Sequence, residues 1–164
     1  MKKLPYGISN YEELITENYY YVDKTEYIEK LEELAEKRIM FLRPRKFGKT
    51  LFTSMIEKYY DIQTVEKFEL LFKDTYIGKN PTKLKNSYYI LKFNFSGIDT
   101  TNEESTIRGF KREVASSIKV FIEKYKIDFF VNEEQEAEDI LDNLIKAFRN
   151  TKVKRENLCN NRRI

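Results

Sequence analysis

Apolar residues recur at helical spacing in five stretches of the chain. Within each stretch they stand three or four positions apart, which places them on one face of a helix. The four longer stretches span residues 24–37, 49–61, 103–126 and 133–149, and a short one spans 64–72. Asp23 or Thr25 is available to cap the first of them. The pattern therefore predicts five helices, each with one apolar face.

Two other stretches have the pattern of strands. Residues 38–42, RIMFL, form a short apolar run that Pro44 ends, and residues 88–98, YYILKFNFSGI, alternate until Gly97. The turn-rich residues 78–87 between them predict a loop. Helices that alternate with strands in this order are typical of an α/β fold, so we predict an α/β fold.

The composition excludes several classes of protein. The 164 residues are 41% hydrophobic and 35% charged, which is typical of a single globular domain. No apolar run approaches the roughly 18 to 20 residues of a membrane span, and the N-terminus has no secretory pattern. The chain has one cysteine, Cys159, and no histidine, so Ser–His and Cys–His catalytic pairs are excluded. These features favour a cytoplasmic protein without a disulfide framework.

The positive net charge of +3 comes from the end of the chain. Residues 149–164 contain six basic residues and one acidic residue, which leaves residues 1–148 with a net charge of −2. The body of the chain therefore has no basic excess that would indicate nucleic-acid binding.

The octapeptide RPRKFGKT, residues 43–50, is the main candidate for chemistry. A phosphate-binding loop, or Walker A motif, reads G-x-x-x-x-G-K-S/T and lies between a strand and a helix. Gly48, Lys49 and Thr50 match it, whereas Arg43 replaces the first glycine. The predicted strand and helix lie on the expected sides. From this pattern a nucleotide-phosphate loop is favoured over a basic turn before a helix, which stays open as the alternative.

From Leu4 to about Phe148 the chain resembles the AAA-ATPase-like family of prokaryotic P-loop proteins, which are often fused to a nuclease-like domain. Three segments carry the resemblance: LPYGISNYEELITENYYYVDKTEYIEKLE, FLRPRKFGKTLFTSMIEKYYD and YYILKFNFSGID. In that family the loop itself typically begins with arginine, so Arg43 fits the family pattern. The resemblance implies a three-layer α/β P-loop NTPase domain of the AAA/ASCE type.

The resemblance also implies the site residues. Lys49 would contact the β- and γ-phosphates of ATP, and Thr50 would bind Mg²⁺ together with the nucleotide. The loop amides would line the phosphate site; they belong to Arg45, Lys46, Phe47, Gly48, Lys49 and Thr50. Asp23, Lys24 and Thr25 match a family element expected near the base or ribose. For Asp23 and Thr25, helix capping is an equal alternative.

One element of the family is missing. An acidic Walker B strand should follow residue 148, but residues 151–164 are a basic segment without periodicity. Codons for its last six residues can be chosen so that a shift of one nucleotide reads Val-Ile-Ile-Asp-Glu-Tyr, the missing pattern. We therefore expect residues 1–150 to be the N-terminal part of the domain and residues 151–164 to be an out-of-frame tail. A genuine basic terminus is the alternative.

Three functions remain as candidates. The leading prediction is an ATP-binding P-loop domain that ends before Walker B and does not hydrolyse ATP alone, although the family implies an ATPase. The second is a non-catalytic interaction module with an unused loop, which would bind a protein partner or a second copy of the chain. The third is a nucleic-acid binder that uses the basic tail; the family association also connects the chain to nucleic acid.

Overall fold

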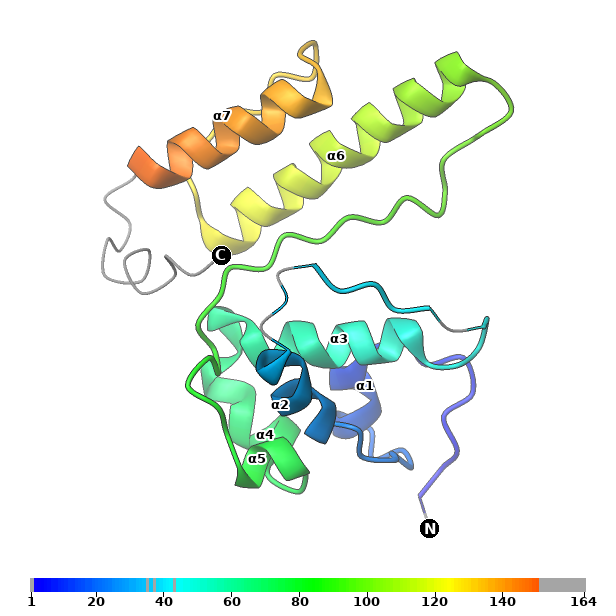
Figure 1. The fold of residues 1–164 in the computed structure, drawn as a ribbon, viewed down its shortest axis with the longest axis vertical. Coiled ribbons are helices and arrows are strands. Elements are labelled where there is room, and N and C mark those ends of the chain that lie inside the picture. The colour runs from blue at the N-terminus through cyan, green and yellow to red at the C-terminus, as the bar shows by residue number, and fades with distance from the viewer. Residues whose placement is uncertain (1, 35, 37, 43, 151–164) are drawn as a thin grey trace. The chain divides into compact units, whose positions relative to one another are not determined.

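The computed structural model describes residues 2–34, 36, 38–42 and 44–150. Within that part the chain is helical (Figure 1). It forms α1 (Tyr11–Thr16), α2 (Glu26–Glu33), α3 (Lys49–Tyr60), the 3₁₀ helix η1 (Ile62–Lys67), α4 (Phe68–Phe72), α5 (Tyr76–Lys79), α6 (Glu103–Tyr125) and α7 (Ala137–Asn150). The chain divides into two compact units, one that ends at Tyr89 and one that begins at Ile90.

The prediction of an α/β fold is wrong, and with it the three-layer P-loop domain. The described residues contain no sheet; they contain only two isolated bridges, Lys3 with Tyr19 and Asp61 with Tyr88. Residues 38–42 and most of residues 88–98 are irregular and belong to no strand ladder. The physical reason is that an apolar run fits a strand only where a second strand supplies hydrogen bonds.

The helices follow the periodicity more closely. The helices predicted at 49–61 and 103–126 are confirmed as α3 and α6. The one predicted at 24–37 is found over a shorter range, as α2, and α7 begins at Ala137 rather than near residue 133. The short stretch 64–72 is divided between η1 and α4. Helix α5 lies partly inside the predicted loop. Its N-cap is Thr75, whose Oγ1 accepts a hydrogen bond from the Gly78 amide at 3.2 Å.

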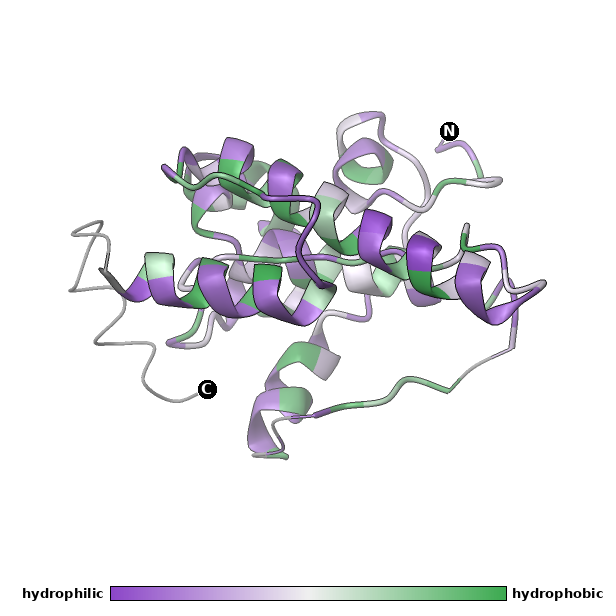
Figure 2. Ribbon diagram, turned by 90° about the horizontal axis from the view of Figure 1, so that it is seen from above, coloured by the Kyte–Doolittle hydropathy of each residue, from purple (hydrophilic) through white to green (hydrophobic). Residues whose placement is uncertain are grey.

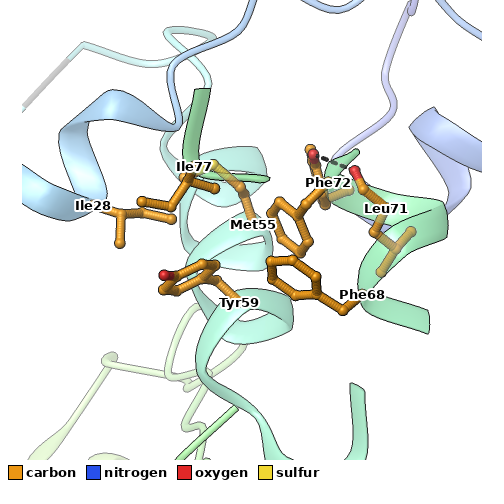
Figure 3. Packing of buried hydrophobic residues seen from close by; sticks show 8 residues of the cluster. Ile28, Met55, Tyr59, Phe68, Leu71, Phe72 and Ile77 are labelled. Atoms are coloured by element: carbon orange, nitrogen blue, oxygen red, sulfur yellow. Dashed lines mark hydrogen bonds between the residues drawn. The ribbon is translucent and has the colours of Figure 1, made fainter. Parts of the chain in front are cut away.

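The core of the first unit surrounds one face of α3 (Figure 3). Met55 and Tyr59 from α3 are buried with residues of every other α-helix of this unit. These are Tyr11, Ile28, Phe68, Leu71, Phe72 and Ile77. The Tyr11 ring stacks on Phe72 with centroids 5.2 Å apart, and its hydroxyl donates to the Leu71 carbonyl at 2.9 Å. The core therefore fixes the orientation of α3, whose first residue is Lys49.

The second unit is a helical hairpin in which α6 and α7 lie side by side (Figure 1). Val114 and Ile118 of α6 and Ile140 and Leu144 of α7 are buried. Figure 2 shows hydrophilic and hydrophobic residues mixed along both helices. Asp99 accepts hydrogen bonds from the amide and hydroxyl of Thr101, a turn interaction. None of the described helices has the length and apolarity to cross a lipid bilayer.

Candidate functional site

Residues 44–48 form a tight turn before α3. We call this turn, together with the first two residues of α3, the glycine–lysine loop (residues 44–50). Gly48 is the N-cap of α3 and has φ +72°, in the left-handed region that glycine enters without strain. Lys46 also has a positive φ, of 67°. No side chain of the N-cap residue bonds the first amides of α3. The positive end of the helix dipole therefore lies at this loop, where it favours an anion.

Lys49 bends back over this loop. Its Nζ donates a hydrogen bond to the Pro44 carbonyl at 2.9 Å, and the side chain is half-buried. Thr50 is exposed in the first turn of α3, and Arg45, Lys46 and Phe47 are exposed in the loop. The loop residues named from the sequence thus gather at one helix end. Arg43, like residues 151–164 with Cys159, lies outside the described residues.

A small pocket of about 60 Å³ opens beside the loop. It is lined by Lys24, Tyr27, Phe41, Phe47, Gly48, Lys49 and Phe52. The pocket therefore brings Lys24 of the aspartate–lysine–threonine element to Gly48 and Lys49, more than twenty positions later. Its two charged lining residues are both lysines, which favours an anionic ligand. Arg45, Lys46 and Thr50 do not line it.

Asp23 and Thr25 bond elsewhere, to the beginning of α5. Asp23 Oδ2 accepts from the Tyr76 amide at 2.7 Å, and Thr25 Oγ1 accepts from the Ile77 amide at 3.1 Å. Asp23 Oδ1 also accepts from the Thr25 amide at 2.8 Å. Thr25 is fully buried and makes no side-chain cap bond to its own helix, α2. The sequence offered Asp23 or Thr25 as a cap for the helix at 24–37, but in the described part of the chain α2 has no side-chain cap bond, and both side chains bond the first amides of α5 instead. They also fix the backbone on both sides of Lys24.

The neighbouring tyrosines 19–21 do not line the pocket. Tyr21 packs edge-on against Tyr11, with ring centroids 5.3 Å apart, and its hydroxyl donates to Met55 Sδ at 3.5 Å. Burial raises the pKa of Tyr21 to about 12. This tyrosine is therefore a packing residue of the first unit.

Sequence reasoning missed the aromatic residues of the pocket, Tyr27, Phe41 and Phe52. One signal was present in the spacing: Tyr27 follows Lys24 by three positions, and Phe52 follows Lys49 by three. Residues three apart lie on the same side of a helical turn. Such spacing could have paired each lysine with a ring, but only tertiary structure brings the two pairs together.

Comparison with known proteins gives one finding. No curated protein and no solved structure matches the chain. A family model described as "Predicted AAA-ATPase" matches residues 5–157, which is most of the sequence. This match includes the whole glycine–lysine loop and the element around Lys24. The chain therefore belongs to the AAA-ATPase-like family.

Proposed function

We propose that this protein binds ATP through its phosphates at the glycine–lysine loop. The observation that carries the proposal is the beginning of α3. There Gly48 has a left-handed conformation and no side chain to cap α3, and the Lys49 ammonium group bends back to the Pro44 carbonyl of the same loop. Together they provide the N–H donors, the helix dipole and the charge that a phosphate group requires. Family membership supports a nucleotide as the source of that phosphate.

Each residue has a distinct role in this proposal. The backbone amides from Arg45 to Thr50 donate to phosphate oxygens. Lys49 moves from the Pro44 carbonyl to the β- and γ-phosphates, and Thr50, which is exposed, contributes its hydroxyl to a Mg²⁺ ion carried by the nucleotide. Lys24, on the far side of the pocket, adds a second positive charge.

The test is a calorimetric titration of the protein with MgATP. Lys49→Ala should weaken binding about 10- to 100-fold, because a charge-assisted hydrogen bond contributes about 1.5–3 kcal/mol. Lys83→Ala removes an exposed lysine of the same unit outside the pocket and is the matched control. Equal affinity of Lys49→Ala and the unmodified protein would refute the proposal.

A second candidate, an interaction module for a protein partner or a second copy, is supported by residues 38–42. Met40 and Leu42 are 81% and 82% exposed, although both are large and apolar. Exposed apolar segments of this kind are typical of surfaces that other chains cover. If the protein binds MgATP and Lys49→Ala abolishes that binding, the loop has a ligand, and an interaction module with an unused loop is excluded.

A further inference from the structure

We infer that the aromatic residues beside the glycine–lysine loop hold the base of the nucleotide, and that they make the site prefer a purine nucleoside triphosphate to a bare triphosphate. This inference rests on the proposed binding of phosphate at the loop. It assigns the base contact to the rings that line the pocket. Asp23 and Thr25 are not needed for it, because their side-chain oxygens already hold α5.

The first argument is the lining of the pocket. Four of its seven residues are aromatic, namely Tyr27, Phe41, Phe47 and Phe52. Three of these rings belong to residues that are 42%, 43% and 60% exposed: Tyr27, Phe41 and Phe47. A pocket of about 60 Å³ does not enclose a purine, but rings partly open to water beside two lysines offer a surface on which a flat apolar group can stack while its negative charge meets the lysines.

The second unit provides a contrast. The pocket on α6 is lined by Arg108, Lys111, Arg112, Ala115, Ser116, Lys119 and Glu133. It contains four cations and no ring, and Glu133 and Glu136 already pair with Lys119 and Lys111. The pocket on α6 would therefore bind an anion through charge alone and would not distinguish a nucleotide from a bare phosphate. The pocket beside the glycine–lysine loop therefore differs in having both kinds of contact.

The arrangement of the rings is the second argument. Phe52 lies at the centre: its ring centroid is 5.0 Å from that of Phe41 and 6.4 Å from that of Tyr27, which meets it edge-on. Phe52 follows Lys49 by one turn of α3, about 5 Å along the axis. Lys49, which would contact phosphate, and Phe52, which would contact the base, therefore lie on the same side of α3. Lys30 covers part of Tyr27, with its Nζ 4.8 Å from the ring centroid.

Stacking on such rings predicts a measurable selectivity. Removal of an aromatic side chain that stacks on a base typically weakens binding by about 10-fold or more. A purine presents more ring surface than a pyrimidine, so the order of affinity should be ATP, then CTP, then inorganic tripolyphosphate. The preference should depend on Tyr27 and Phe47, whereas affinity for tripolyphosphate should depend on the lysines Lys24 and Lys49 and not on the rings.

The experiment compares these three ligands, each with Mg²⁺, on the full chain. The unmodified protein should bind ATP about 10-fold more tightly than tripolyphosphate. Tyr27→Ala should remove most of that difference and leave the affinity for tripolyphosphate unchanged, whereas Tyr27→Phe should keep the difference. Tyr20→Ala, at an exposed tyrosine outside the pocket, is the matched control.

Each failure has a separate signature. If the protein binds tripolyphosphate and ATP equally, the aromatic subsite is wrong and the phosphate site stands. If neither ligand binds, the proposed function fails and the subsite fails with it. If Tyr27→Ala loses helicity by circular dichroism, Phe47→Ala decides, since Phe47 lies in the exposed loop. An unchanged ratio of ATP to tripolyphosphate affinity in Phe47→Ala would then overturn the inference.

Discussion

Gly78 shows how a single residue sets the spacing of two helices in the first unit. A Cβ atom at this position would lie 1.8 Å from the carbonyl oxygen of Phe72. That distance is far below any allowed contact, and the obstacle is backbone, which cannot rotate away as a side chain would. Only glycine therefore lets α5 approach the end of α4 this closely.

The first prediction follows from this contact. Gly78→Ala should destabilise the first unit by about 2–3 kcal/mol, because α5 must move away from α4 and disturb Ile77 in the core. Urea denaturation followed by circular dichroism measures the change. Gly97→Ala, where a Cβ would meet nothing within 4 Å, should have little effect. Equal urea midpoints for Gly78→Ala and Gly97→Ala would contradict a close approach of Gly78 to the Phe72 carbonyl oxygen.

At the scale of elements, α5 exists because distant residues cap it. The helix has only four residues, Tyr76–Lys79, and is too short to be stable by itself. Its first amides are bonded by Asp23, Thr25 and Thr75. Two of these three caps lie about fifty positions earlier in the chain.

Thr25→Val tests whether the hydrogen bond from the Ile77 amide to Thr25 holds α5 in place. Valine keeps the shape of threonine but removes the oxygen that accepts from the Ile77 amide, and the buried amide then loses its partner. We expect a loss of about 1–3 kcal/mol in the free energy of unfolding and faster hydrogen exchange at Ile77. Thr16→Val, at an exposed threonine, is the control. Unchanged exchange at Ile77 would show that the bond does not hold α5.

The same elements show what could be predicted from the sequence. Helices α3 and α6 were predictable because their apolar period is local. The loop before α3 was predictable because glycine, lysine and threonine are adjacent in the chain. Residues 38–42 were not, since a strand depends on a neighbour that no local pattern reveals. Helix α5 and the aromatic part of the pocket were missed for the same reason: their determinants are distant in sequence.

At the scale of the whole molecule, residues 38–42 should govern solubility. Exposed apolar side chains with unpaired backbone groups are a typical site of self-association. Met40→Lys should therefore reduce concentration-dependent association, measured by light scattering, without a change in helicity. Val65→Lys, at an exposed apolar residue of η1, is the control. If Val65→Lys had an equal effect, net charge and not the segment would be responsible.

The hydrogen bond from the Lys49 ammonium group to the Pro44 carbonyl competes with any anion that binds the glycine–lysine loop. An anion that binds Lys49 must displace the Pro44 carbonyl oxygen from its ammonium group. The contribution of Lys49 to the affinity for a ligand is thus reduced by the hydrogen bond to Pro44 that it gives up. A change that moved the Pro44 carbonyl away from Lys49 would remove this competing bond, so the backbone conformation at Pro44 would tune the affinity for an anion.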